Sequence, residues 1–323
     1  MLQKEKFNLI SYSALVEQFS NEQTESYAKP TEDTIATFGM SHEAAGNPKA
    51  ACFSHKNIVT QLNALSQYHI VVPEPNDLYY SHIPIHVFSE RVQIWRVQAA
   101  GGTVFIAQNN FSAEDNEEEF KSQFLAELQR AKPTVFGTTP FILERIRQVV
   151  LQKIRSLDGL SRTLFQKARE SKLENLKQND EKDHSLYDMV LKDFQQLFGG
   201  NLRLIITNYC FDPQMQNFLN ELKILLSVRV CQMFGYLETT GPIFLTQYWE
   251  QNYGILGEPT DNAEFKLIPL SLQENESQMK NSQTLSVLSG QSVKNDEAGD
   301  EQWTTGLLWV RGPSVFCGYF KHE

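Results

Sequence analysis

The strongest constraint on the fold is an alternation of short apolar segments with segments of helical periodicity. Two runs rich in β-branched residues, 202–207 and 228–233, flank a stretch that begins with Asp212-Pro213 and then repeats apolar residues at helical spacing. Aspartate followed by proline is typical of a helix start, because the carboxylate caps backbone N–H groups and proline fits the first turn. Strands that alternate with helices form a mostly parallel sheet covered on both faces. We therefore predict an α/β fold in which a mixed or parallel sheet is layered with helices.

The same alternation extends toward the N-terminus. Apolar periodicity and turn signals predict further strands at 34–38, 79–85, 103–107 and 133–137, and helices at 57–68, 90–100, 142–150, 157–184 and 187–198. A further helix is predicted after the cap Ser112, with Phe120, Phe124 and Leu128 on one face. We expect the segment 157–184 to be an exposed helix or helical hairpin, because it is charged and holds few large apolar residues.

The composition changes near residue 254. Apolar runs at 263–270 and 306–311 indicate a small β-rich unit, whereas residues 271–300 are rich in Ser, Gln, Asn and Glu and predict a disordered insert. The predicted division is a polar lead-in at 1–31, an α/β domain at 32–253 and a β-rich subdomain at 254–323.

Charge and composition exclude several classes of protein. The 323 residues carry a formal net charge of -10, which argues against general binding of nucleic acid. No stretch reaches the ~18 apolar residues that a membrane-spanning helix needs, and the first ten residues lack the apolar core of a signal peptide. The four cysteines have no CxxC spacing; we expect Cys210 and Cys231 to be buried thiols in a reducing compartment.

The segment 232–241, QMFGYLETTG, holds the first candidate site. It places a Gly-bearing turn directly after the apolar strand at 228–233, and the turn presents Glu238 beside two threonines. Glycine lets backbone approach a ligand closely because it has no Cβ. A lone carboxylate can hold Mg²⁺ against phosphates. An ordinary solvated loop with an acid is the alternative that the segment leaves open.

Further segments occur in an order that carries a family resemblance. They are SHEAAGNPKAACFSHKNIV (41–59), YYSHIPIHVFSERV (79–92), KPTVFGTTPFILERI (132–146), GGNLRLIITN, QMFGYLETTG, GILGEP and RGPSVFCGYFK (311–321). Together they resemble the adenylate-forming (AMP-binding) superfamily, and within it the long-chain fatty acid–CoA ligases. The first is similar to the family's phosphate loop, which ends in Gly-x-Pro-Lys, and the second to its Leu-Pro-x-x-His-x-x-Glu-Arg segment.

This resemblance implies an ATP-dependent acid–thiol ligase. Such enzymes activate a carboxylic acid with ATP and Mg²⁺ to an acyl-adenylate, release pyrophosphate and pass the acyl group to coenzyme A. The implied partners are a long-chain fatty acid, ATP and coenzyme A. The implied location is the cytoplasm, either free or at the surface of the endoplasmic reticulum or another membrane through peripheral association.

The resemblance also assigns roles to residues of this sequence. It implies that Lys49 and Glu238 are catalytic, with Glu238 also the Mg²⁺ ligand. The implied nucleotide-binding residues are Ser41, Gly46, Asn47, Asn208, Tyr209, Phe234, Gly235 and Thr239, and the implied acyl-pocket residues are His86, Val87 and Tyr236. The prediction that links these roles is that the backbone around Gly46 and the acid at Glu238 converge on one pocket.

Several positions depart from the family pattern. Glu43 replaces a glycine of the phosphate loop, where its charge would repel a triphosphate. Ala44 and Ala45 replace Ser or Thr, and Leu237 replaces the threonine before the metal-binding acid. We also expect the mobile C-terminal domain of the family to be absent, since the sequence stops at Glu323. Three functions stay open: an active ligase, a non-catalytic relative that binds a nucleotide, an acyl group or a protein partner, and a chain that does not fold stably alone.

Two histidines form the remaining candidate. His82 and His86 stand four residues apart, as metal ligands on a helix do, but Pro84 between them breaks such a helix. We therefore do not expect a metal site at this pair.

Overall fold

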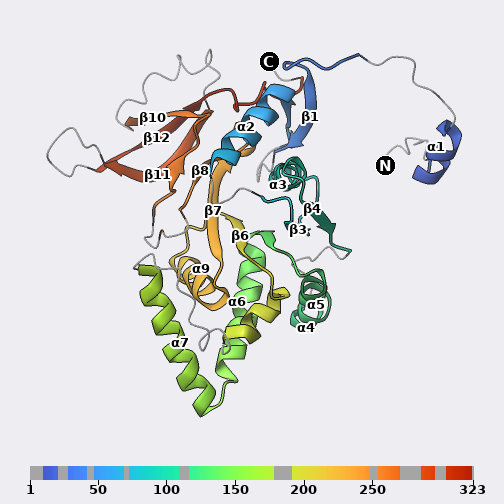
Figure 1. Ribbon diagram of the computed structural model, residues 1–323. Helices are drawn as coiled ribbons and strands as arrows, with labels where there is room; N and C mark the ends of the chain where they lie inside the picture. Colours follow the sequence, from blue (N-terminus) through green and yellow to red (C-terminus); the bar gives the residue numbers. More distant parts are fainter. Residues whose placement is uncertain are drawn as a thin grey trace, which may run out of the picture.

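The computed structural model describes residues 10–20, 28–41, 47–68, 73–108, 116–177, 191–247, 250, 254–269, 285–294 and 303–321 (Figure 1). The strands are β1 (Ile35–Met40), β2 (Ala50–Ser54), β3 (Leu78–Ser81), β4 (Thr103–Ile106), β5 (Val135–Thr138), β6 (Leu204–Asn208), β7 (Arg229–Tyr236), β8 (Gly241–Leu245), β9 (Glu258–Pro259), β10 (Glu264–Pro269), β11 (Leu285–Lys294) and β12 (Trp303–Arg311). The helices are α1 (Tyr12–Phe19), α2 (His55–Gln67), α3 (Phe88–Ala99), α4 (Glu117–Glu119), the π-helix η1 (Phe120–Leu125), α5 (Ala126–Ala131), α6 (Pro140–Arg155), α7 (Gly159–Lys177), the 3₁₀ turn η2 (Gln196–Phe198), α9 (Pro213–Leu226) and the 3₁₀ turn η3 (Leu237–Thr239).

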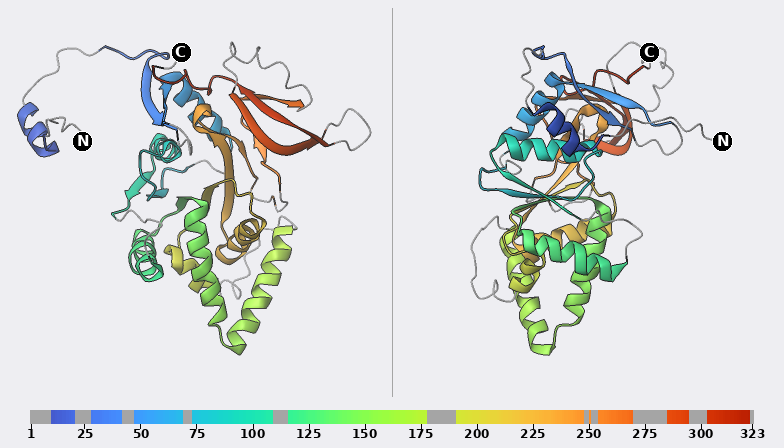
Figure 2. Two further views of the ribbon diagram at one scale, coloured as in Figure 1. Left: turned by 180° about the vertical axis from the view of Figure 1, so that it is seen from behind. Right: turned by 90° about the vertical axis from the view of Figure 1, so that its right-hand side faces the viewer.

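A seven-stranded sheet in the order β4-β3-β5-β6-β7-β8-β9 forms the centre of the molecule. The strands from β4 to β7 run parallel, and β8 and β9 continue the sheet antiparallel. Figure 1 shows α2 and α3 above the strands and α5, α6 and α9 below them, and Figure 2 shows the same layering from two other sides. The mixed sheet layered with helices confirms the predicted fold class.

Alternate residues of the parallel strands supply two separate cores. Neighbouring strand residues face opposite sides of a sheet. Accordingly Tyr80 and Phe136 pack into the core beneath α5, α6 and α9, while Tyr79 and Val135 pack into the core beneath α2 and α3. All four side chains are almost fully buried. The continuous apolar runs in the sequence therefore reflect burial on both faces.

The helix predicted after Asp212 begins as expected. The Asp212 carboxylate accepts hydrogen bonds from the backbone N–H groups of Gln214 (3.3 Å) and Met215 (3.1 Å), and Pro213 occupies the first helical position. The predicted burial of Cys210 and Cys231 is also confirmed. The predicted cap Ser112 and residues 178–184 of the predicted helix at 157–184 lie outside the described residues.

A small antiparallel sheet in the order β10-β12-β11 follows the central sheet, as predicted for the C-terminal part. The expectation of disorder throughout 271–300 is wrong, because β11 (Leu285–Lys294) pairs with β12 inside that segment. Its alternation of Leu and Val with Ser suits a strand, although its overall composition is polar. Residues 271–284 and 295–300 lie outside the described residues.

Two predicted strand ends are also corrected. The strand predicted at 79–85 stops at Ser81, since Pro84 and its neighbours form a turn before α3. The strand predicted at 228–233 continues through Gly235 to Tyr236, so the glycine lies within β7 and the turn begins at Leu237. A Cβ at Gly235 would collide with the backbone of Gly241 and Pro242 on β8.

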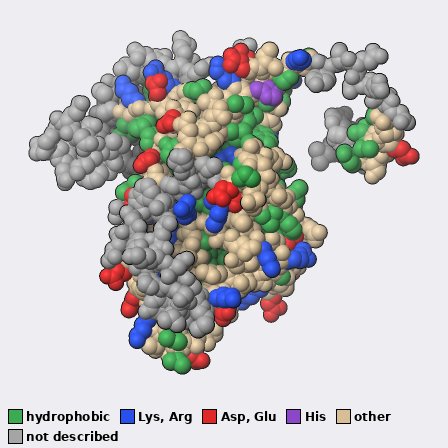
Figure 3. Space-filling view, viewed as in Figure 1, with side chains coloured by type: hydrophobic (Ala, Val, Ile, Leu, Met, Phe, Trp, Pro, Cys, Tyr) green, Lys and Arg blue, Asp and Glu red, His purple; other side chains and the backbone are tan. Residues whose placement is uncertain are grey.

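The surface and the helices add two observations. On the face shown in Figure 3, acidic and basic side chains are interspersed. Within the described residues, no helix combines the length and the apolar character needed to cross a bilayer.

Candidate functional site

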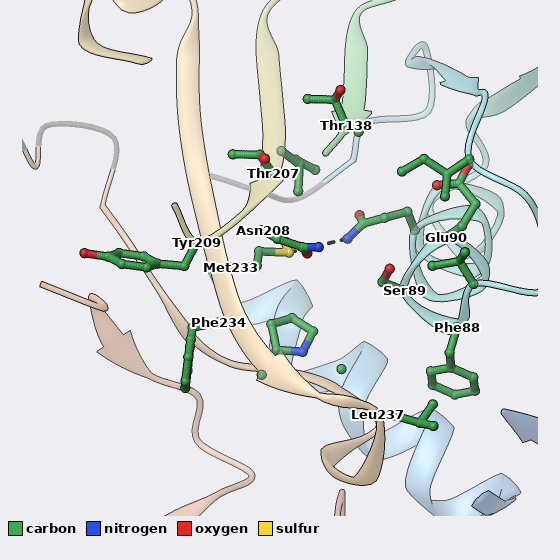
Figure 4. A pocket seen from close by; sticks show the side chains of 18 of the residues that line it. Phe88, Ser89, Glu90, Thr138, Thr207, Asn208, Tyr209, Met233, Phe234 and Leu237 are labelled. Carbon is green, nitrogen blue, oxygen red and sulfur yellow. Dashed lines mark hydrogen bonds between the residues drawn. The ribbon is translucent and has the colours of Figure 1, made fainter. Parts of the chain in front are cut away.

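A cavity of about 370 Å³ lies at the carboxyl ends of β5, β6 and β7, beside the first turn of α3. This edge is where open α/β sheets bind their ligands, because the loops that leave the strands there surround a crevice. The last residues of the three strands and the start of the helix therefore decide what the cavity can hold (Figure 4).

Several predicted site residues meet at this cavity. Among its lining residues are Val87, Asn208, Tyr209, Phe234, Gly235 and Tyr236. Val87 precedes α3 and the others come from the ends of β6 and β7, so residues from distant parts of the sequence are brought together. His86, which was predicted beside Val87, is exposed and is not part of this lining.

The rings of Tyr209 and Phe234 leave the centre of the cavity open. Figure 4 shows the Tyr209 ring turned away from the side chains of Thr138 and Glu90 across the cavity. The ring packs edge-on against Phe211, with 4.9 Å between their centroids. Phe234 meets Tyr236 in the same way at 5.4 Å. The aromatic residues thus contact one another and form one wall.

Thr138 at the end of β5 carries an unsatisfied hydroxyl on the opposite wall. Its side chain is buried, and among the described residues its Oγ1 has no hydrogen-bond partner. A buried hydroxyl without a partner costs about 1–3 kcal/mol. Such a group at a cavity wall is suited to a polar atom of a ligand.

Glu90 in the first turn of α3 is the one acid among the described residues that line the cavity. Its carboxylate accepts hydrogen bonds from the Tyr79 hydroxyl (2.7 Å) and the Ser81 hydroxyl (2.6 Å). Burial raises the pKa of Glu90 to about 7, although both hydrogen bonds favour the charged form. Glu90 was not predicted as a site residue, and the only signal for it was its place in the Glu-Arg pair of the second family segment.

His82 is packed in the protein interior near the carboxyl ends of the strands. Its Nε2–H donates to the carbonyl oxygen of Gly137 over 2.9 Å, and its ring stacks on Phe136. Burial lowers the pKa of His82 to about 4, so the ring is neutral at physiological pH. His82 is buried and His86 is exposed, which separates the two histidines.

Lys49 and Glu238 both contact the side chain of Tyr319. The Tyr319 hydroxyl donates to Glu238 Oε1 over 2.6 Å, and the Lys49 ammonium lies 5.2 Å from the centre of the Tyr319 ring. A second contact comes from the backbone N–H of Phe316, which donates to the Glu238 carbonyl oxygen (2.8 Å). Tyr319 was not predicted as a site residue, although it belongs to the last family segment.

The base of the predicted phosphate loop is closed by hydrogen bonds. The Ser41 N–H donates to the Lys49 carbonyl oxygen, and the Lys49 N–H donates to Ser41 Oγ, both over 2.9 Å. Asn47 is exposed beside this closure. Gly46 lies outside the described residues, so the predicted convergence of its amides with Glu238 on one pocket stays a prediction.

Thr239 stabilises the turn that carries Glu238 through hydrogen bonds of its hydroxyl. Its hydroxyl accepts from the Tyr236 N–H (3.0 Å) and lies 2.6 Å from the Gly241 carbonyl oxygen, which accepts from it. The side chain is fully buried and does not appear in the cavity lining. Leu237, by contrast, lines the cavity and lies against Gly39 of β1. The cavity therefore reaches the turn but not the Glu238 carboxylate.

The donor set suits a magnesium–nucleotide beside the cavity, at a rim that consists of Lys49, Glu238 and Tyr319 next to the lining residue Leu237. A carboxylate offers about four lone-pair sites, so Glu238 can accept from Tyr319 and still ligate a cation. Within the described residues, no group of three His, Cys, Asp or Glu side chains is arranged to hold a metal alone. Mg²⁺ commonly binds through one or two carboxylates together with substrate phosphates. Among the described residues that line the cavity there is no Lys or Arg, so its interior suits an adenine ring or an acyl chain.

Comparison with protein families gives one match over almost the whole chain. The model described as "AMP-binding enzyme" matches residues 11–320. Among curated proteins, the chain is 24% identical over 318 residues to "Long chain acyl-CoA synthetase 6, peroxisomal" of Arabidopsis thaliana, covering 98% of this chain and 40% of the relative. It is 25% identical over 303 residues to "Fatty acyl-CoA synthetase B" of Dictyostelium discoideum, covering 92% of this chain and 39% of the relative. The chain thus spans about two fifths of the length of these relatives.

Solved structures share the fold. An O-succinylbenzoate coenzyme A synthetase from Bacillus subtilis in complex with AMP superposes with a TM-score of 0.56 at 16% identity, over 95% of this chain and 59% of that chain. The complex of the same synthetase with ATP and magnesium gives a TM-score of 0.55 at 16% identity, over 95% of this chain and 48% of that chain.

Proposed function

Because the chain belongs to the AMP-binding enzyme family, we propose that it forms the substrate-binding core of a long-chain fatty acid–CoA ligase. In this role it binds ATP with Mg²⁺ and a long-chain fatty acid, and activates the acid for transfer to coenzyme A. The names of its relatives and the AMP and ATP complexes of the similar synthetase support these ligands.

One observation carries the proposal. Lys49 and Glu238 are 189 residues apart in the sequence, yet both contact Tyr319 at the rim of the cavity. A cation and a carboxylate on one side of a ligand pocket suit a phosphate and its metal ion, respectively. The other half of the ligand enters the cavity, where the aromatic wall of Phe234 and Tyr236 offers a stacking surface.

The chain's own residues divide the work. Lys49 binds a phosphate oxygen, and Tyr319 orients Glu238 toward the metal ion. Mg²⁺, when bound, offsets the charge that builds up on the phosphates. Thr138 and Asn208 supply hydrogen bonds within the cavity, while Val87 at the start of α3 has no polar side-chain atom to cap the helix. The uncapped first turn of this helix is suited to an anionic group such as a substrate carboxylate.

A second candidate is a binding module without catalysis. Leu237 fills the place beside Glu238 with an apolar side chain packed toward Gly39 and the cavity, which removes a hydroxyl donor from the turn. The volume of about 370 Å³ is near the lower end of the roughly 300–1,000 Å³ range of ligand pockets. A cavity of this size holds one small ligand, either the nucleotide base or an acyl chain.

Pyrophosphate release distinguishes the two candidates. The purified chain is given ATP, Mg²⁺ and palmitate, with Glu238→Gln as the matched variant that keeps the side-chain shape. The ligase proposal predicts pyrophosphate that depends on palmitate and is lost in the variant. Calorimetric binding of ATP–Mg²⁺ without pyrophosphate supports the binding module. Absence of both release and binding contradicts both candidates.

A further inference from the structure

Two cysteines from opposite ends of the chain lie on adjacent antiparallel segments. The Cys317 N–H donates to the Cys52 carbonyl oxygen over 3.0 Å, and the Cys52 N–H donates to the Gly318 carbonyl oxygen over 2.9 Å. One residue further along, Ala51 and Tyr319 form an antiparallel bridge. Residues 317–320 therefore add a strand-like segment to β2, and a bulge places Cys317 and Gly318 together opposite Cys52.

This backbone pairing places the two cysteines opposite each other on adjacent antiparallel segments, where a disulfide can join them. Opposite residues of regular antiparallel strands have Cα atoms roughly 4.5–5.5 Å apart, and a bulge alters this spacing locally. Disulfides form when the Cα atoms are roughly 4.4–6.8 Å apart. Both cysteines are thiols in this structure.

The two thiols differ in access. Cys317 is exposed, and its Sγ donates to the Asn57 side-chain oxygen over 3.3 Å. Cys52 is half-buried beside Phe38, its register partner on β1. Burial and the nearby Cys317 thiol raise the pKa of Cys52. An exposed thiol beside a less accessible one is the usual arrangement of an attacking and a resolving cysteine.

We propose that Cys52 and Cys317 form a site of reversible thiol–disulfide exchange with a small disulfide such as oxidised glutathione. The Cys317 thiolate attacks one sulfur of the oxidant and releases one glutathione thiol, which leaves a mixed disulfide on Cys317. The Cys52 thiolate then attacks the Cys317 sulfur and releases the second glutathione. The protein loses two electrons and two protons, and the oxidant gains them as two thiols.

The bond would fix the segment that holds Glu238. Phe316 and Tyr319, on either side of the Cys317–Gly318 bulge, make the backbone and hydroxyl contacts with Glu238. A covalent link from Cys317 to β2 ties this segment to the strand that follows Lys49. Oxidation therefore acts at the rim of the cavity, although formation of the disulfide does not depend on what the cavity binds.

Oxidation of the whole reduced chain by oxidised glutathione tests the site. We expect the native chain to lose two of its four thiols, to become lighter by two hydrogens, and to yield a tryptic peptide pair joined through Cys52 and Cys317. Dithiothreitol should restore both thiols. Cys210→Ser is the matched control at a buried thiol and should leave the cross-link unchanged.

Single variants separate the two steps. Cys52→Ser should retain one glutathione on Cys317, because the resolving thiol is gone, and Cys317→Ser should give no cross-link. Circular dichroism of each variant verifies that it folds. Three results overturn the proposal: a native chain that keeps all its thiols, one that stays glutathionylated at Cys317, or one whose only disulfides join separate chains.

Discussion

The two ends of the parallel strands each hold a buried carboxylate, and the hydrogen-bond donors around them differ. Asp77 at the amino ends accepts from a guanidinium, a hydroxyl and a backbone N–H, whereas Glu90 near the carboxyl ends accepts from two hydroxyls. Asp77 accepts from the Arg203 guanidinium, the Thr134 hydroxyl (2.6 Å) and the Glu74 N–H (2.6 Å). Burial alone would raise the pKa of Asp77, but the hydrogen bonds from Arg203 and Thr134 outweigh it and lower the pKa.

Glu90 accepts hydrogen bonds from two hydroxyl donors, and burial raises its pKa to about 7. Thr138, at the same edge, has a buried hydroxyl without a partner among the described residues. The comparison shows how one sheet divides its tasks. Satisfied polar groups at the amino edge stabilise the fold, and unsatisfied ones at the carboxyl edge remain available to a ligand.

The largest expected effect is at the amino edge. Asp77→Ala removes the buried carboxylate that joins the half-buried Arg203 guanidinium and the Thr134 hydroxyl at the starts of β3, β5 and β6, and should lower the free energy of unfolding by about 3 kcal/mol. Urea denaturation measures the change. Glu264→Ala, which breaks the exposed pair with Arg311, is the control and should cost under about 1 kcal/mol. Equal losses in the two variants would contradict the role assigned to Asp77.

Glu90→Gln should instead raise the free energy of unfolding. A carboxyl group with a raised pKa in the folded state stabilises the fold below pH ~4.5, and this contribution is lost as the pH rises through about 7. The amide of glutamine stays neutral at every pH, so this loss does not occur in the variant. Its free energy of unfolding should therefore exceed that of the native chain by up to about 3 kcal/mol at pH 8. At pH 4.5 the two should be nearly equal. Unfolding free energies at both pH values decide; a difference independent of pH would show that Glu90 is not held as described.

Thr138→Val should stabilise the chain by about 1 kcal/mol, because valine has nearly the same shape and no hydroxyl to leave unsatisfied. The same change should weaken ligand binding by about fivefold, since it removes a hydrogen bond worth about 1 kcal/mol. Thermal melting and calorimetry measure the two effects. Thr139→Val, which removes the α6 cap outside the cavity lining, is the matched control and should lower stability. If Thr138→Val lowers stability too, its hydroxyl has a partner in the folded chain.

The smallest expected effect is at the rim. Tyr319→Phe keeps the ring beside Lys49 but removes the hydroxyl that donates to Glu238. ATP–Mg²⁺ affinity should fall about threefold, because Glu238 is still present but less well oriented. Isothermal titration calorimetry measures the change, and an unchanged affinity would separate Tyr319 from the proposed metal site.

Local signals made much of the sheet and its helices predictable. The Asp212-Pro213 start of α9 and the β-branched run of β6 each depend on neighbouring residues alone. β11 was missed because polar composition outweighed its alternating Leu and Val, and the end of β7 was misplaced because a glycine inside a strand has the same sequence signal as a turn.

The site was predictable only in part. Asn208, Phe234 and Gly235 lie at the carboxyl ends of β6 and β7, so their meeting at this edge follows from the topology of parallel strands. The contact of Tyr319 with Glu238, and the burial of Glu90, depend on packing between segments far apart in the chain. Such contacts leave no periodic pattern in either segment.

A double-mutant cycle on ATP–Mg²⁺ affinity tests the central claim that Lys49 and Glu238 act on one bound phosphate group. Calorimetry on the native chain, Lys49→Ala, Glu238→Gln and the double variant gives the coupling between the two side chains. We predict that each single change weakens binding at least tenfold. The fold-loss in affinity of the double variant should be smaller than the product of the two single fold-losses, which corresponds to a coupling of about 1 kcal/mol. Strictly additive losses, or unchanged affinity in both single variants, would contradict the claim.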